Sequence, residues 1–353
     1  MRYELETLSP VHIGNGDQYT IMDSVLSNNY FYPINMNKFY EKLQDIGKIQ
    51  DYLSYTAENR LLSDYLLSIH MKHEEISKYK IKLTEQNKND MQFLKKVNIS
   101  QFIKNGLGEV YIPGSEIKGA IRTAIIYNLL KNPQNYDYLQ SQRRNIQYLG
   151  SNIEAHLLRS KNDAKYDILK YLEITDSSSQ PPSTLEIVHV ISYWTRGKHS
   201  YAEVLPSKIK LSGTINIVKR EIALASLGLS NRGDILSEET ILKSIYTHTN
   251  DLIEHEISFY KSQHAEQFIK EMQEIKEKNK EKNPVLRLGQ GQGFLSTTIN
   301  LIIKNNDPEL YDMIRRNTKR RSYPNIFPKT RRFVMENNKP SYTLGWIKLM
   351  VEE

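Results

Sequence analysis

The clearest structural signal in the chain surrounds the stretch PGSEIKGAIR, residues 113–122. The strand-like residues 109–112 come before it, Pro113-Gly114-Ser115 predicts a tight turn, and apolar side chains at helical spacing continue to Leu129. Residues 109–131 therefore predict a strand, a turn and an amphipathic helix in direct succession.

The second half of the chain repeats this plan. Residues 285–288 predict a short strand, three glycines alternate over residues 289–293, and an apolar stretch runs from Phe294 to Ile303. Period-two runs predict further strands at residues 2–8, 21–26, 30–34, 184–191, 208–218 and 342–351. Polar tracts predict helical insertions at about 38–100 and about 221–283. We expect an α+β protein of two related modules, residues 1–180 and residues 181–353.

Composition excludes several classes of protein. The sequence contains no cysteine, which excludes disulfides, cysteine-ligated zinc, iron–sulfur clusters and cysteine nucleophiles. No apolar run approaches the roughly 18 residues of a membrane-spanning helix, and the first residues lack the apolar core of a signal peptide. We therefore expect a cytoplasmic protein. The net charge of +7 suits a polyanionic partner where the cations are clustered.

The predicted helix after residue 113 offers an anion site. Ser115 is placed to cap the helix, and Lys118 and Arg122 lie four residues apart on one face. Gly119 keeps that face low, so that a phosphate backbone could approach the helix N-terminus. The alternative is a capped helix with two solvated cations. Ser115-x-x-Lys118 also matches the nucleophile motif of penicillin-recognising enzymes, but the companion motifs of those enzymes are missing.

The glycine loop is a second candidate binding element. Its spacing fits no dinucleotide fingerprint, because Phe294 stands where the last glycine is required, and no Walker lysine follows. We expect the loop backbone to track phosphates, its glutamines to contact bases or ribose, and the aromatic ring to stack. The alternative is a tight loop that needs positive φ angles. The residues involved are Gly289, Gln290, Gly291, Gln292, Gly293 and Phe294.

Residues 315–332 carry eight cations and no carboxylate, with Tyr323 and Phe327 interleaved. Charges and aromatic rings in one segment suit single-stranded nucleic acid. The alternative is a solvated basic loop. The candidate contacts in this segment are Arg320, Arg321, Arg331 and Arg332.

His12 stands apart from the other histidines because it lies in the glycine-rich turn after the first predicted strand. Its imidazole could contact RNA or act as an acid or base. Asp23 is an acid close to it in sequence and a second catalytic candidate. The remaining histidines fall mostly on predicted helices, where a surface position is expected, so we expect no metal and no cofactor.

Four of these strings together resemble the motifs of the RAMP superfamily. They are residues 8–16 (LSPVHIGNG), residues 113–122, the loop from Gly289 to Phe294, and Leu344-Gly345-Trp346, in that order along the chain. The sequences of these motifs are most similar to those of the fifth-subunit family of type III-A CRISPR (Csm) complexes. The resemblance implies ferredoxin-like (RRM-type) modules with large helical insertions.

The resemblance also implies a function. Members of that family are non-catalytic subunits that bind guide RNA (crRNA) near its 3′ end, cap the filament of backbone subunits and support guide-RNA maturation in antiviral defence. The implied partners are guide RNA, target RNA, the neighbouring backbone and small Csm subunits, and recruited host nucleases. By position, Lys118, Arg122, Gly289, Gly291 and Gly293 inherit RNA contacts.

Two enzymatic alternatives remain open at this point. Some RAMP proteins cut guide RNA without a metal by means of an N-terminal histidine, which His12 would supply. Backbone RAMP subunits cut target RNA with an acidic residue in an early loop, which Asp23 would supply.

Overall fold

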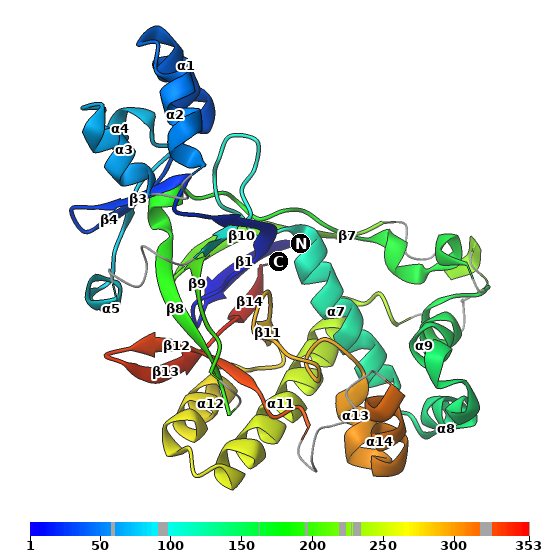
Figure 1. Ribbon diagram of the computed structural model, residues 1–353. Helices are drawn as coiled ribbons and strands as arrows, with labels where there is room; N and C mark the ends of the chain where they lie inside the picture. Colours follow the sequence, from blue (N-terminus) through cyan, green and yellow to red (C-terminus); the bar gives the residue numbers. More distant parts are fainter. Residues whose placement is uncertain are drawn as a thin grey trace.

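The computed structural model describes residues 1–57, 61–90, 98–161, 163–194, 197–218, 224–226, 228, 234–317 and 327–352. Helices and strands are mixed along the chain, which confirms the predicted α+β class. Figure 1 shows two sheets near the centre of the molecule, a helical arm at one end and longer helices packed against the strands.

The first sheet has the strand order β11-β14-β1-β10-β7. These strands are β1 (Arg2–Thr7), β7 (Leu172–Ile174), β10 (Lys210–Ile217), β11 (Val285–Arg287) and β14 (Trp346–Glu352). The central strand β1 pairs antiparallel with β10 and β14, so that Leu5 lies opposite both Leu211 and Leu349. The alternation predicted for residues 2–8 is confirmed, because Tyr3, Leu5 and Thr7 are buried.

The second sheet has the order β13-β12-β8-β9-β6-β2. Its strands are β2 (Gly14–Tyr19), β6 (Ile99–Phe102), β8 (Glu186–Tyr193), β9 (His199–Val204), β12 (Arg331–Glu336) and β13 (Lys339–Thr343). The pair β6–β9 is parallel, and the other pairs are antiparallel. Both sheets draw strands from both sides of residue 180, while the division into two modules at that residue stays a prediction.

The helical arm contains β3 (Ser24–Ser27), β4 (Tyr30–Pro33), α1 (Met36–Asp45), α2 (Ile49–Thr56), α3 (Leu62–Ser68), α4 (His73–Ile76), β5 (Ile81–Lys82) and α5 (Glu85–Asn89). It has a core of its own, in which the Phe39 and Tyr65 rings lie 4.8 and 4.9 Å from the Tyr52 ring. The hairpin β3–β4 turns at Asn28 and Asn29, which both have positive φ, as a tight two-residue hairpin turn requires.

The longer helices pack against the sheets and against one another. They are α7 (Gly114–Leu129), α8 (Pro133–Ser141), α9 (Leu149–Leu158), α11 (Glu238–Ser262), α12 (Glu266–Lys278), α13 (Asn300–Asn306) and α14 (Pro308–Asn317). Short 3₁₀ turns occur at Arg143–Tyr148, Ala164–Tyr166, Ile168–Tyr171 and Pro182–Thr184. The helices α7 and α11 pack together, and the Tyr127 hydroxyl donates to Asp251 at 2.7 Å.

Three sequence-based boundaries are corrected by the structure. Residues 109–112 form isolated bridges at Val110 rather than a strand. Residues 342–351 are not one strand, because Gly345 (φ 92°) turns the chain between β13 and β14. The apolar stretch after the glycine loop becomes helical only at Asn300. Among the described residues, no helix is long and apolar enough to cross a membrane.

Candidate nucleic-acid interface

Three of the four sequence motifs meet through their backbones. They are the N-terminal motif (residues 8–16), the glycine loop (residues 289–293) and the closing motif (residues 344–346). The Gly345 amide donates to the Pro10 carbonyl at 2.9 Å, and the Gly345 carbonyl accepts from Leu288 at 2.7 Å. The Gln290 amide donates to the His12 carbonyl at 2.8 Å. Segments more than 270 residues apart in sequence therefore form one structural unit.

Two glycines in this unit have no room for a side chain. A Cβ on Gly289 would lie 2.1 Å from the His12 carbonyl oxygen, and a Cβ on Gly345 would lie 2.3 Å from the Leu288 carbonyl oxygen. Both residues also have positive φ, which L-residues with side chains rarely adopt. The close approach of three backbones thus requires glycine at both positions.

The outer part of the glycine loop faces solvent. Gly291 (φ 102°) packs against Leu344, whereas Gly293 (φ 81°) is exposed and has open space where a Cβ would point. The Gln292 side chain accepts from Ser296 at 3.4 Å. The Gln290 side chain makes no hydrogen bond to any residue that the structure describes. The loop therefore presents backbone and one uncommitted amide to a ligand.

Phe294 follows the loop and is partly buried against the main core. Its ring centroid lies 5.4 Å from that of Phe327. One side of the ring is therefore engaged by the protein. The base stacking that the sequence predicts for Phe294 would have to use the part of the ring that remains exposed.

At the predicted anion site of α7, Ser115 does not cap the helix as expected. The helix begins at Gly114 after Pro113, so that Ser115 lies inside the first turn, is exposed and does not cap the helix. The Gly114 amide instead donates to an Asp176 carboxylate oxygen at 2.8 Å. A carboxylate thus already occupies part of the positive helix end.

Lys118 and Gly119 remain available on the outer face of α7. Lys118 is half-buried and takes part in no ion pair between described residues. Gly119 is exposed, and nothing lies within 4 Å of the point where its Cβ would be. No side chain projects from this face at Gly119, and Lys118 supplies a cation without an acidic partner among the described residues, as the sequence predicts for a surface that binds a phosphate backbone.

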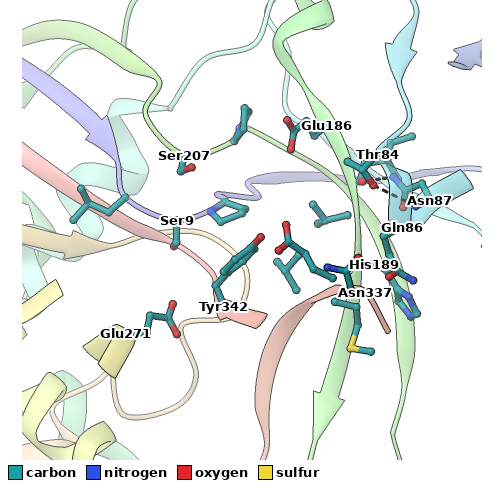
Figure 2. A pocket seen from close by; sticks show the side chains of 18 of the residues that line it. Ser9, Thr84, Gln86, Asn87, Glu186, His189, Ser207, Glu271, Asn337 and Tyr342 are labelled. Atoms are coloured by element: carbon teal, nitrogen blue, oxygen red, sulfur yellow. Dashed lines mark hydrogen bonds between the residues drawn. The ribbon is translucent and has the colours of Figure 1, made fainter. Parts of the chain in front are cut away.

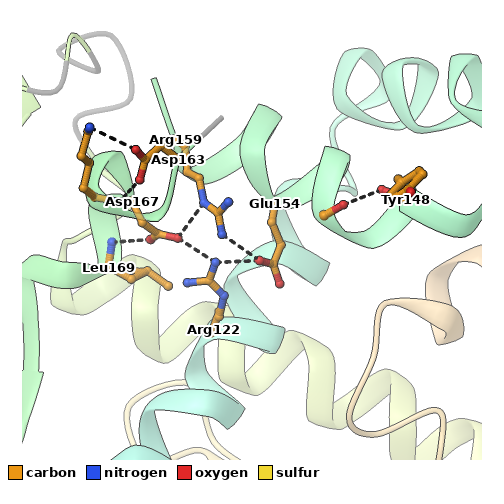
Figure 3. A network of polar contacts seen from close by, with 9 residues as sticks. Arg122, Tyr148, Glu154, Arg159, Asp163, Asp167 and Leu169 are labelled. Atoms are coloured by element: carbon orange, nitrogen blue, oxygen red, sulfur yellow. Dashed lines mark hydrogen bonds and ion pairs between the residues drawn. The ribbon is translucent and has the colours of Figure 1, made fainter. Parts of the chain in front are cut away.

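Arg122, one turn further along, has internal partners. It pairs with Glu154 at 2.9 Å and Asp167 at 2.7 Å, and Arg159 bonds to the same two carboxylates (Figure 3). The structure therefore places Arg122 in a network that ties α7 to α9, instead of leaving it beside Lys118 as a free cation.

The helix α7 and the continuation of the glycine loop approach each other. Arg122 and Thr123 line a pocket of about 280 Å³ together with residues 297–300. The fourth motif therefore borders the segment that follows the glycine loop.

His12 is a core residue in the structure. Its side chain is 3% exposed, its Nδ1 lies 2.6 Å from the Glu203 carbonyl oxygen, and its ring meets Phe102 edge-on. Burial lowers the pKa of His12, although the Glu203 carbonyl opposes this shift. An RNA chain on the surface cannot reach this imidazole, so His12 contributes to the interface through its backbone carbonyl.

The described residues of the basic segment do not form one exposed patch. Arg315 and Arg316 pair with Asp312 on α14. Arg331 is 6% exposed, pairs with Glu256 at 2.7 Å and lies over the Phe259 ring. Arg332 is exposed on β12. The predicted contacts Arg320 and Arg321 lie outside the described residues.

The model of the RAMP superfamily matches residues 4–329 of the chain. The chain belongs to the RAMP superfamily. Two curated relatives bear the name "CRISPR system Cms protein Csm5". That of Methanocaldococcus jannaschii is 27% identical over 388 residues, covering 100% of this chain and 89% of the relative. That of Streptococcus thermophilus is 35% identical over 135 residues, covering 35% of this chain and 37% of the relative.

Solved structures share the fold of this RAMP protein. A chain in the cryo-EM structure of a Csm–crRNA–target RNA ternary complex from a type III-A CRISPR–Cas system matches with a TM-score of 0.80 at 22% identity, covering 99% of this chain and 100% of that one. The crystal structure of T. onnurineus Csm5 matches with a TM-score of 0.70 at 20% identity, covering 98% of this chain and 99% of that one. The resemblance predicted from the motifs is confirmed.

Two residues that support the interface of this RAMP protein were not predicted. Arg287 is 5% exposed, lies over the Trp346 ring at 4.8 Å, and donates to the Leu344 and Gln292 carbonyls. It links the glycine loop to the closing motif. An arginine within an otherwise apolar strand was the sequence signal for this role.

Glu203 is the second such residue. It is fully buried, pairs with Lys104 at 2.6 Å, and accepts from the Tyr79 hydroxyl and the Phe102 amide. Its own carbonyl holds His12. Nothing in the local sequence around Glu203 indicates burial, because its partners lie about 100 residues away.

Asp23, the second catalytic candidate, stabilises a turn of this RAMP protein. One of its carboxylate oxygens accepts from the Thr20 hydroxyl at 2.8 Å, and its carbonyl accepts from the Ile34 amide. Within the described ranges, no three histidine or carboxylate side chains are grouped closely enough to hold a metal ion.

Proposed function

We propose that this RAMP protein is a subunit of a type III-A Csm complex that binds guide RNA near its 3′ end and caps the filament of backbone subunits. The names of its relatives and the complex that contains its structural neighbour support this assignment. The observation that carries it is the meeting of three motifs in one backbone unit, where the glycine loop presents bare backbone, while α7 borders the segment that follows the loop.

The geometry suits a sugar–phosphate backbone better than a particular base sequence. Exposed loop amides and the Lys118 ammonium bind phosphate oxygens, and the Gln290 side chain can hydrogen-bond ribose or a base edge. Such contacts give binding that weakens with salt and varies little between guide sequences. Guide RNA, target RNA and the neighbouring backbone and small Csm subunits are the partners.

In this proposal, the chain supports guide-RNA maturation without supplying a catalytic residue. The imidazole of His12 is enclosed by the core, and the Asp23 carboxylate is bound to Thr20. A subunit that covers the RNA near its 3′ end determines where other nucleases stop trimming. The purified protein should therefore leave repeat RNA intact.

The substitution Lys118→Glu tests the interface. It should weaken guide-RNA binding by a similar factor for different guide sequences and reduce the dependence of log affinity on log salt concentration by about 1. The matched control is Lys243→Glu, which makes the same charge change at an exposed position of α11. Filter binding over a salt series measures both. Equal losses for the two variants would mean that general charge, rather than this surface, governs RNA binding.

A further inference from the structure

A groove of about 660 Å³ lies beside the second sheet, between β8, β12, α5 and α12. Figure 2 shows Glu186, His189 and Asn87 on one side of this space, and Glu271 and Tyr342 on the other. Ser9 and Pro10 of the N-terminal motif line part of it. The groove is a feature that neither the sequence nor the proposed RNA surface accounts for.

The groove is acidic although the chain as a whole is basic. Its lining includes five glutamates. Among the described lining residues, Lys278 is the one lysine, and there is no arginine. The glutamates are Glu85, Glu186, Glu271, Glu274 and Glu336. A concave surface of one sign concentrates its field, so this groove repels RNA and attracts cations.

Three of these glutamates have no basic partner among the described residues. Glu186, Glu271 and Glu336 form no ion pair with any residue that the structure describes. Burial, together with the charge of Glu336, raises the pKa of Glu186, and burial raises the pKa of Glu336. Burial raises the pKa of Glu271 to about 7, against the opposing hydrogen bonds from Thr343.

Two buried oxygen atoms in the lining lack donors. Asn87 is fully buried, and its amide donates to the Ile187 carbonyl, but its Oδ1 has no partner among the described residues. Glu271 accepts from Thr343 through Oε1, whereas its Oε2 has no partner there either. Unpaired buried acceptors are unfavourable. Both atoms lie in the wall of the groove and add to its acceptor character.

The floor of the groove is apolar. Val188 and Val334 are buried within a small cluster, and Tyr342 packs against it; all three line the groove. Carboxylates above an apolar floor match a lysine or arginine side chain, whose aliphatic stem packs on apolar surface while its charged end reaches polar groups. A bare metal ion fits less well, since the described residues offer no group of three ligands for one.

We propose that this groove binds a lysine- or arginine-bearing segment of a partner protein. The inference does not depend on the proposed RNA-binding function, because it concerns a surface of opposite charge. It gives the chain two separate docking surfaces, one for a polyanion at α7 and the glycine loop, and one for a cationic polypeptide.

The test uses the full-length protein and a fluorescein-labelled oligolysine peptide, with binding followed by fluorescence anisotropy. The double substitution Glu186→Gln with Glu336→Gln should weaken binding by about tenfold. The control Glu238→Gln with Glu239→Gln removes the same charge at the exposed N-terminus of α11 and should leave the affinity near that of the wild type. The single substitution Glu336→Gln, at an exposed position, gives a smaller effect in the same direction.

Two further measurements separate this proposal from its competitors. Guide-RNA affinity should be unchanged in the groove variants, and a loss would assign the groove to the RNA surface and overturn the proposal. Oligolysine binding should strengthen as the pH rises through about 7, because Glu271 then ionises, and Glu271→Gln should remove that dependence. Equal weakening by the groove and control substitutions would also overturn the proposal, since it would indicate diffuse attraction.

Discussion

At the scale of single residues, Gly289 and Gly293 belong to one loop but differ in their surroundings. Both have positive φ, yet a methyl group at Gly289 would strike the His12 carbonyl, whereas one at Gly293 would meet open space. We expect Gly293→Ala to cost about 1–2 kcal/mol of unfolding free energy from backbone strain. Gly289→Ala should cost roughly 1–3 kcal/mol more through overpacking. Urea denaturation of the two variants measures this difference, and equal costs would contradict the described packing.

The buried ion pair between Lys104 and Glu203 gives a second residue-scale prediction. Lys104→Met leaves a fully buried carboxylate without its cation, and we expect a loss of about 3–5 kcal/mol in unfolding free energy. Lys210→Met is the matched control, because its partner Glu4 lies on the surface and the pair is well solvated. Chemical denaturation should show a large loss only for the first variant, and similar small losses would argue against a buried role for Glu203.

The sequence alone predicted the backbone conformation of the loop glycines better than it predicted the partners of the charged residues. Alternating glycines at 289, 291 and 293 indicate positive φ angles locally, and all three adopt them. Arg122 and Arg331 carry no such local information. Their partners Glu154, Asp167 and Glu256 lie 32 to 75 residues away and are brought near only by the fold. A free cation and a buried one therefore look alike in sequence.

At the scale of elements, the network around Arg122 connects α7, α9 and the loop at Asp167. Burial by itself raises the pKa of Asp167, but the hydrogen bonds and charge of Arg122, with help from Leu169 and Arg159, outweigh it and hold the pKa below its usual value. A depressed pKa in the folded state stabilises the protein at pH values above the unfolded pKa. This contribution is then lost as the pH falls through the folded pKa.

Asp167→Asn should therefore lower the unfolding free energy at neutral pH and flatten its decline below about pH 4. Urea denaturation at a series of pH values measures both effects. Glu4→Gln, which alters an exposed pair, is the control and should leave the acid decline unchanged. If wild type and Asp167→Asn lost stability in parallel on acidification, the network would not contribute to the attachment of α7.

Elements defined by local patterns were predicted well, and elements defined by tertiary contacts were not. The strand β1, the hairpin β3–β4 and the helix α7 follow from alternation, turn residues and helical spacing. Residues 132–180 lacked such patterns, although α8, α9 and β7 form there against the body of the protein. The break between β13 and β14 depends on the contact of Gly345 with Leu288, which is 57 residues away.

At the scale of the whole molecule, the two halves of the chain share their sheets. The strand β1 is paired on both sides by strands that begin more than 200 residues later. We expect residues 1–180 expressed alone to show no cooperative thermal unfolding by circular dichroism, because β1 then has no partner strand. Mixing with residues 181–353 should restore a cooperative transition. A cooperative transition of residues 1–180 alone would show an independent module.

The central claim is that this RAMP protein binds guide RNA within a Csm complex. The most direct test is to purify the tagged protein from native cells, sequence the bound RNA and identify the bound proteins by mass spectrometry. The wild type should bring down guide RNAs of defined 3′ length together with other Csm subunits, and Lys118→Glu should lose the RNA or change its length while the protein stays folded. Recovery of neither guide RNA nor any Csm subunit with the wild type would contradict the claim.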